Sequence, residues 1–183
     1  MLKLNTVLQM ENNVEEIKRV LDNMKTELGK FPNQSMMKQN VYANNSWYLE
    51  IGFIEAKLDQ IFLNWDWVID STEFVINAYM VRGTLTVTTL ANTKIVRSGI
   101  GASEIQLRKG STGVGVSDIA SKALERDVPK AESQALKNAA SKLGNIFGRN
   151  MNRDFKYGHV ADDKLIDKIY NTERLLEEGD KEE

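Results

Sequence analysis

The fold is decided by the stretch Pro129-Lys-Ala-Glu-Ser-Gln-Ala-Leu-Lys-Asn-Ala-Ala-Ser-Lys-Leu-Gly-Asn-Ile-Phe147. It predicts a helix, because proline is favourable at the first helical position and Gly148 follows the last apolar residue. At about 100° per residue, the apolar side chains fall on one broad face. Half of that face is alanine, so another element can approach it closely. Its members are Ala131, Ala135, Leu136, Ala139, Ala140, Leu143, Ile146 and Phe147.

The opposite side of this helix carries a narrow polar stripe. It consists of Lys130, Gln134, Lys137 and Ser141, with Lys142 at its border. Ammonium groups and small polar groups at spacings of four, three and four suit the phosphates of an extended nucleic-acid strand. Exposed lysines are common on any helix, however, so the stripe alone favours an ordinary solvated face.

The middle of the chain predicts an antiparallel sheet. Four runs are rich in β-branched and aromatic residues and are separated by short connections. These connections favour a meander of three to four strands over parallel crossovers, and we expect the sheet to pack against the long helix. The predicted strands are residues 65–69, 73–80, 82–90 and 94–100.

Helices are predicted on both sides of these strands, which makes the fold α+β. Residues 5–28 and 47–64 show a helical apolar period, and Gly29 and Pro32 end the first of them. The remaining predicted helices are a short one at 117–124 and a last one at 162–178, and the predicted loops are 31–46 and 110–115.

The order of the predicted helices, strands and loops divides the chain into three parts. Residues 1–46 form an N-terminal helix and linker, residues 47–157 form the core, and residues 158–183 form a C-terminal helix with an acidic tail. The two terminal parts are helical extensions of the core.

Composition and charge are those of a soluble globular protein. The 183 residues include no cysteine, which excludes disulfides and thiolate metal sites. The N-terminal residues are too polar for a signal peptide, and no run approaches the about 20 apolar residues of a membrane span. We therefore expect a cytoplasmic protein without a membrane partner.

The net charge of −2 is unevenly distributed. Residues 109–156 hold nine Lys and Arg against five Asp and Glu, whereas residues 161–183 hold four against nine. One basic working face and an acidic tail would give this distribution, and so would chance unevenness.

Enzymatic motifs are absent from the sequence. There is no P-loop, no complete dinucleotide fingerprint and no Gly-x-Ser-x-Gly elbow. The single histidine, His159, cannot form a usual zinc site without cysteine or a second histidine. We expect a protein that is not an enzyme and uses no cofactor or metal.

Several motifs stand in an order that resembles the Rad fifty-two superfamily of single-strand annealing proteins, including bacteriophage members such as Sak. Gly99-Ile-Gly-Ala-Ser-Glu104 is similar to the glycine-containing strand end, and Ser121-Lys-Ala-Leu124 to the start of the helical part. Lys130-Ala-Glu-Ser-Gln-Ala-Leu-Lys137 leads into Lys142-Leu-Gly-Asn-Ile-Phe-Gly148, which resembles the helix ending in a Gly-Asn run. Upstream, Tyr48-Leu-Glu50 and Leu58-Asp-Gln-Ile-Phe62 resemble the first helix and strand.

The resemblance implies a homo-oligomeric ring in which a sheet and a helix of each subunit line a groove for the DNA backbone. Lys122 and Lys137 match DNA-contacting lysines of the family, but Asn138 stands where the family often has a basic residue. The full set of expected nucleic-acid contacts is Lys122, Lys130, Lys137 and Lys142, with Arg149, Arg153, Lys94 and Arg97 as further candidates. Trp47, Trp65 and Trp67 either stack on bases or, as we favour, pack in the core.

The expected function is ATP-independent binding of single-stranded DNA and annealing of complementary strands in homologous recombination and DNA repair. The resemblance also implies a bacteriophage source, with the host cytoplasm as location. The acidic tail is a candidate contact for a host single-strand-binding protein or an exonuclease. A double-stranded RNA or DNA shape reader and an oligomeric scaffold without nucleic acid remain open as alternatives.

Overall fold

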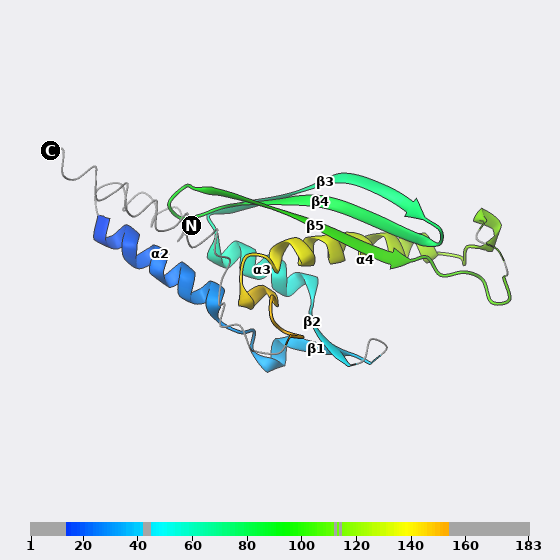
Figure 1. Ribbon diagram of the computed structural model, residues 1–183, viewed down its shortest axis with the longest axis horizontal. Coiled ribbons are helices and arrows are strands. Elements are labelled where there is room, and N and C mark those ends of the chain that lie inside the picture. Colours follow the sequence, from blue (N-terminus) through cyan, green and yellow to red (C-terminus); the bar gives the residue numbers. More distant parts are fainter. Residues whose placement is uncertain (1–13, 42–44, 112, 114, 154–183) are drawn as a thin grey trace. The chain divides into compact units, whose positions relative to one another are not determined.

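The computed structural model describes residues 14–41, 45–111, 113 and 115–153, and its elements are drawn in Figure 1. The described part of the chain is α+β, as expected. Three helices, α2 (Val14–Gly29), α3 (Ile51–Ile61) and α4 (Ala123–Ala140), accompany two sheets. The hairpin β1 (Met37–Asn40) and β2 (Ser46–Leu49) forms one sheet, and β3 (Asn64–Val75), β4 (Ala78–Thr88) and β5 (Lys94–Glu104) form the other.

The larger sheet is the expected antiparallel meander, with the strand order β3-β4-β5. Burial alternates along β4, so that one face of the strand points into the core and the other does not. Val81, Leu85 and Val87 are buried, and their neighbours in the sequence are more exposed. The predicted strand boundaries differ from these bounds, most of all between β3 and β4. Residues 65–75 form one continuous strand, and the chain turns at Ile76 and Asn77, inside the segment predicted as a strand at 73–80.

The chain divides into two compact units, and the strands of the larger sheet contribute to both. Among the described residues, the first consists of 14–41, 45–66, 86–96 and 141–153. Its buried apolar side chains come from α2, from α3 and the residue after it, from strand segments and from the segment that follows α4. They are Leu21, Met24, Leu28, Leu49, Ile54, Leu58, Ile61, Phe62, Val87, Ile95, Leu143, Ile146 and Phe147.

Two predictions in the first unit need correction. Residues 31–46 were expected to be a loop, but Met37 pairs with Leu49 and Asn40 with Ser46 in an antiparallel hairpin. The helix expected over 47–64 begins only at Ile51, because the hairpin takes up the residues before it. Strand β1 is mostly polar and exposed, so it lacks the apolar alternation that indicates a strand.

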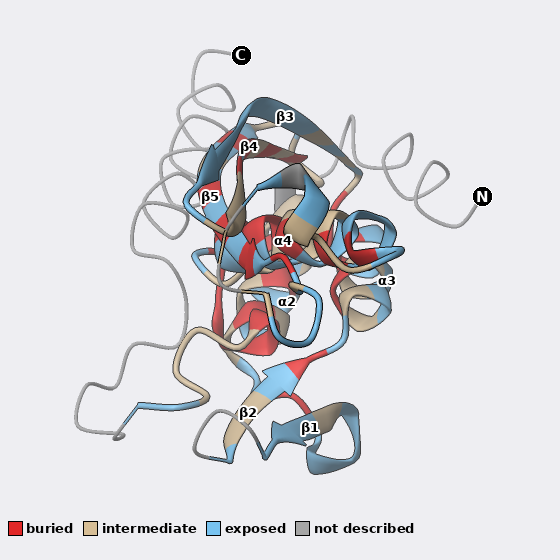
Figure 2. Cartoon of the chain, turned by 90° about the vertical axis from the view of Figure 1, so that its right-hand side faces the viewer, coloured by how far each residue is buried: buried red, intermediate tan, exposed pale blue. Residues whose placement is uncertain are grey.

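The second unit, residues 67–85 and 97–140, is built on a close contact between α4 and β5. A Cβ atom at Gly99 would lie 2.0 Å from the carbonyl oxygen of Ala135, and one at Gly101 would lie 2.2 Å from that of Ala131. Glycine on the strand and alanine on the helix therefore let the two backbones approach closely, which confirms the expectation from the alanine-rich face. Figure 2 shows the buried face of α4 turned toward the sheet.

The bounds of α4 differ from the predicted 129–147. The helix begins at Ala123, so it takes in only the last two residues of the short helix predicted at 117–124, and Pro129 lies inside it. It ends at Ala140, and residues 145–147 form a short 3-10 turn instead. Ser141 and Lys142 consequently lie beyond the helix, and the predicted stripe is shortened to Lys130, Gln134 and Lys137.

The N-terminal helix is confirmed over Val14–Gly29, and Gly29 is its last residue. Its predicted first turns, from residue 5 to 13, and the helix predicted at 162–178 lie outside the described residues, as do His159 and the acidic tail. None of the helices in the described ranges has the length and apolar character that crossing a membrane requires.

Candidate nucleic-acid interface

Four of the eight predicted contacts lie in the second unit. Lys130 and Lys137 are on α4, seven positions or about two turns apart, and therefore on the same side of the helix. Lys122 directly precedes the helix, in a left-handed conformation with φ of 60°. Arg97 is on the inward-facing side of β5. Lys122 and Lys130 are exposed, whereas Lys137 and Arg97 are half-buried.

Asn138, at a position where the resemblance predicted a basic residue, has a structural role. Its side-chain amide donates a hydrogen bond of 2.7 Å to the carbonyl oxygen of Ile100 on β5, and its oxygen accepts one of 3.0 Å from Gln134. Asn138 thus joins α4 to the edge strand beside the close contact at Gly99. A lysine or arginine has no acceptor oxygen for Gln134.

The other four predicted contacts lie in the first unit. Lys94 is exposed on β5, and Arg153 is exposed beyond α4, where Lys142 also lies. Arg149 is half-buried, and its Nη1 atom is buried without a hydrogen-bond partner among the described residues. Each unit therefore holds part of the predicted set, and Lys122, Lys130 and Lys137 lie on one element and its start.

The family-like run at residues 142–148 is mostly core. Leu143, Asn145 and Phe147 are buried, and a Cβ atom at Gly144 would lie 2.4 Å from the carbonyl oxygen of Leu28. Asn145 donates a hydrogen bond of 3.3 Å to the carbonyl oxygen of Gly29 at the end of α2. Gly144 and Asn145, which belong to the family-like run, therefore pack against the end of α2.

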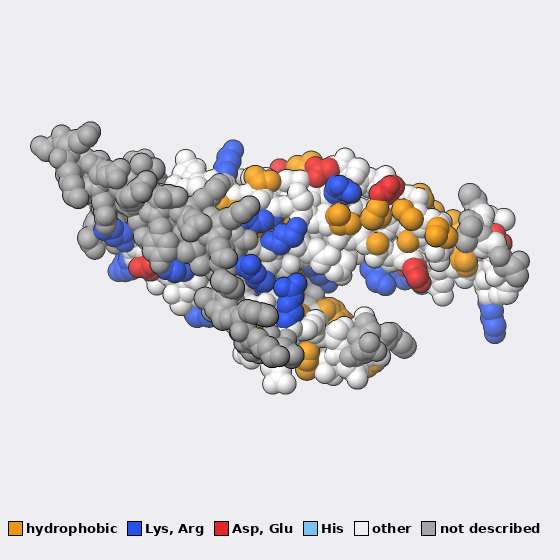
Figure 3. Space-filling model, in the orientation of Figure 1, with side chains coloured by type: hydrophobic (Ala, Val, Ile, Leu, Met, Phe, Trp, Pro, Cys, Tyr) orange, Lys and Arg blue, Asp and Glu red, His pale blue; other side chains and the backbone are white. Residues whose placement is uncertain are grey.

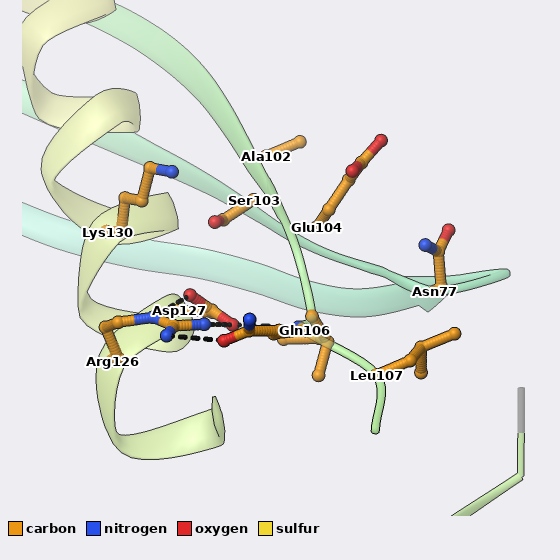
Figure 4. Close-up of a pocket in the computed structure, with 10 residues that line it drawn as sticks. Asn77, Ala102, Ser103, Glu104, Gln106, Leu107, Arg126, Asp127 and Lys130 are labelled. Atoms are coloured by element: carbon orange, nitrogen blue, oxygen red, sulfur yellow. Dashed lines mark hydrogen bonds and ion pairs between the residues drawn. The ribbon is translucent and has the colours of Figure 1, made fainter. Parts of the chain in front are cut away.

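A cleft of about 650 Å³ lies in the second unit between the end of β5 and the first turns of α4. Sequence reasoning missed it, because its residues are far apart along the chain. Figure 4 shows its lining. The polar side chains that line it are Asn77, Ser103, Glu104, Gln106, Arg126, Asp127 and Lys130.

The floor of the cleft is a closed hydrogen-bond network around Asp127, whose residue surface is only 3% exposed. Arg126 donates from Nε to Asp127 Oδ1 and from Nη2 to Oδ2, both at 2.8 Å, and from Nη1 to Gln106 Oε1 at 2.7 Å. The backbone N–H of Gln106 donates to Asp127 Oδ2 at 3.0 Å. These contacts, led by that of Arg126, lower the pKa of Asp127 although burial opposes them.

Two further groups face the space above this network. Lys130 on α4 and Ser103 on β5 point toward one another across the cleft, while Glu104 and Asn77 point away from the helix (Figure 4). Ser103 is only 4% exposed, and its hydroxyl has no hydrogen-bond partner in the described part of the chain.

Two of the tryptophans pack within their units. Trp67 covers the small core of Val81, Ala131 and Ala135, and a Cβ atom at Gly83 would lie 2.4 Å from its ring. Trp65 donates from Nε1 to Asp59 Oδ1 at 2.8 Å. These contacts favour the packing interpretation over base stacking for both residues.

Strand β3 is an edge strand that is exposed over most of its length, as Figure 2 shows. Exposed hydrophobic side chains gather over the strands of the second unit in Figure 3. At the end of β3, Ile76 has a φ of 59° and is 80% exposed. The exposed large hydrophobic residues on β3 and its turn are Val68, Ile69, Phe74, Val75 and Ile76.

Among the described residues, no group of three or more His, Cys, Asp or Glu side chains could hold a metal ion. No protein-family model matches the chain, and no curated protein is significantly similar to it.

Proposed function

We propose that this protein is a member of the Rad fifty-two superfamily that binds single-stranded DNA and anneals complementary strands without ATP, as a homo-oligomeric ring and without acting as an enzyme. The phosphates would lie along α4, where Lys130 and Lys137 share one side and Lys122 precedes the first turn. This placement, on a helix that is held against β5 at Ala131, Ala135 and Ala139, is the observation that carries the proposal.

The rigidity of α4 matters for this function. The close contacts at Gly99 and Gly101 and the hydrogen bond from Asn138 hold the helix at a defined position on the strand. A helix that is held in this way presents its lysines at fixed spacing. The phosphates of a strand can then be bound with the bases left free to test pairing with a second strand. Base-pair stacking, about 1.4 kcal/mol per step, would commit the annealed product.

Repetition of the site would supply affinity that one subunit lacks. Each subunit offers a few salt-labile phosphate contacts, and several subunits on one strand would bind it far more tightly than one. The sheet order leaves β3 and β5 at opposite edges, and β3 carries exposed apolar side chains. Contact between two different edges is heterologous, and such contacts close into rings or extend into filaments.

Fluorescence anisotropy with a labelled oligonucleotide at several salt concentrations tests the proposal. Changing Lys122 and Lys137 together to glutamine should weaken binding and reduce the salt slope by about 0.7 for each phosphate that is no longer neutralised. A matched control changes Lys57 and Lys109, outside the proposed DNA-binding set, to glutamine. Equal binding by the wild type and the Lys122/Lys137 variant would contradict the assignment.

A duplex shape reader is the second candidate, because a sheet flanked by helices also suits that class. A blunt-ended duplex of the same length, used as a competitor in the same experiment, separates the two. Preferential displacement by the duplex would select the shape reader, and absence of any binding at low salt would leave a scaffold.

A further inference from the structure

The cleft between β5 and α4 combines a cation with a buried hydroxyl group. Lys130 points into it from the helix and Ser103 from the strand (Figure 4). Buried hydroxyl groups almost always have a hydrogen-bond partner, since leaving one unsatisfied costs about 1–3 kcal/mol. The Ser103 hydroxyl has none among the described residues, so its hydrogen-bonding capacity is available to a ligand that reaches it.

The lining of the cleft holds two cations, Arg126 and Lys130, and two carboxylates, Asp127 and Glu104. The guanidinium of Arg126 and the carboxylate of Asp127 neutralise each other through two hydrogen bonds of 2.8 Å. Glu104, the other carboxylate at the rim, points away from α4 (Figure 4). Above the floor there remain the ammonium of Lys130 and the hydroxyl of Ser103, which are both hydrogen-bond donors. Such a pair suits an oxyanion.

We propose that this cleft binds one phosphate group, with the Lys130 ammonium supplying charge and the Ser103 hydroxyl donating a hydrogen bond to a phosphate oxygen. The inference deepens the proposed function and rests on it, because the phosphate would belong to the bound single strand. Since less than 1 Å² of the Ser103 oxygen is accessible, entry of the phosphate requires a side-chain rotation at Ser103 or Lys130.

The effects of Ser103→Ala on stability and on DNA binding separate phosphate binding by Ser103 from a purely structural role. If Ser103 only fills space, Ser103→Ala removes an unsatisfied buried hydroxyl and affects nothing else. Stability then rises or stays equal, and binding is unchanged. If Ser103 binds a phosphate, the same variant is equally or more stable but binds the strand less tightly. Weaker binding without lower stability is therefore diagnostic.

The experiment compares the full chain with its Ser103→Ala, Lys130→Gln, doubly substituted and Lys109→Gln variants. Binding of a fluorescent oligonucleotide is measured across salt concentrations. Ser103→Ala should weaken binding roughly threefold to tenfold with an unchanged salt slope. Lys130→Gln should reduce the slope by about 0.7. The double variant should show less than the product of the two single effects, because both groups bind the same phosphate.

Inorganic phosphate gives a second readout that does not depend on DNA binding. The thermal midpoints of the wild type and Ser103→Ala are compared in sodium phosphate and in sodium chloride of equal ionic strength. Phosphate stabilises most proteins in general, so the informative quantity is the extra stabilisation of the wild type over the variant.

Wild-type affinity of Ser103→Ala for the oligonucleotide would overturn the inference, as would a Lys130→Gln variant indistinguishable from Lys109→Gln. If the wild type binds no oligonucleotide, the proposed function fails, and the phosphate measurement alone decides. Extra stabilisation of the wild type would then support a phosphate site for a ligand other than DNA, and equal stabilisation would overturn the site.

Discussion

Gly99 and Gly101 leave no room for a side chain at the contact between β5 and α4. The nearest atoms are backbone atoms of α4, chiefly those of Ala131, Ala135 and Ala139, which cannot move aside without moving the helix. The two glycines are therefore required by the approach of two backbones. They set the distance at which α4, and with it Lys130 and Lys137, is held.

We expect Gly101→Ala and Gly99→Ala each to lower the free energy of unfolding by about 1–3 kcal/mol, since each forces a displacement of α4. Urea denaturation followed by circular dichroism measures the change. Gly52→Ala is the matched control, because a Cβ atom there meets nothing within 4 Å. Because alanine favours the helix more than glycine does, Gly52→Ala should raise the free energy of unfolding by about 0.5–1 kcal/mol. Equal effects at Gly52 and Gly101 would refute the close contact.

Asp127 makes stability depend on pH in a defined direction. Its pKa is lowered in the folded protein, chiefly by the hydrogen bond from Arg126. Its contribution is therefore complete above the unfolded value of about 3.9 and is lost as the pH falls through the folded pKa. The stability difference between the wild type and Asp127→Asn should shrink as the pH is lowered from about 6 toward acid, as measured by urea unfolding at each pH. A difference that is constant over this range would contradict the assignment.

At the scale of elements, α4 contains a residue that weakens it. Pro129 lies inside the helix and has no N–H to donate to the carbonyl group of Glu125. Pro129 is exposed, so its ring contributes little packing that a substitution would remove.

Pro129→Ala should therefore raise the free energy of unfolding by about 1–3 kcal/mol. The greater flexibility of the unfolded chain without proline reduces this gain slightly. Chemical denaturation gives the value. Lys130 should keep its place on the helix, so oligonucleotide affinity should not fall. A destabilised variant would show that Pro129 helps the fold in a way that helix propensity does not capture.

The sequence predicts those elements whose pattern is local. The alternation in β4 and the apolar period of α2 indicate their structure directly, and the alanines of α4 indicate a close neighbour. The hairpin of β1 and β2 could not be found, because β1 is polar and exposed and Leu49 of β2 also fits the helical period of the residues that follow it. The start of α4 was misplaced since a proline usually marks a first turn. The cleft was missed because Ser103 and Asp127 come together only through tertiary packing.

For the whole molecule, the exposed apolar side chains of β3 have a consequence for assembly. Soluble proteins seldom leave an edge strand both exposed and apolar, because it recruits other strands. If a second copy covers β3 in the proposed ring, a charge placed there should prevent assembly.

Phe74→Lys should therefore shift the purified protein toward smaller species in sedimentation velocity, with unchanged circular dichroism. Phe74 is 61% exposed, so the folded subunit should tolerate the charge. Val41→Lys, at an exposed site in the other unit, is the control and should sediment as the wild type does. If Phe74→Lys sediments like the wild type, β3 is not the contact.

The most direct measurement of the central claim is the rate at which two complementary oligonucleotides, one with a fluorophore and one with a quencher, anneal without ATP. The wild type should accelerate annealing, and the Lys57/Lys109 control should match it. The variant with Lys122→Gln and Lys137→Gln should be slower, and more so at higher salt. Annealing no faster than that of the free strands, or an undiminished rate in the Lys122/Lys137 variant, would contradict the account.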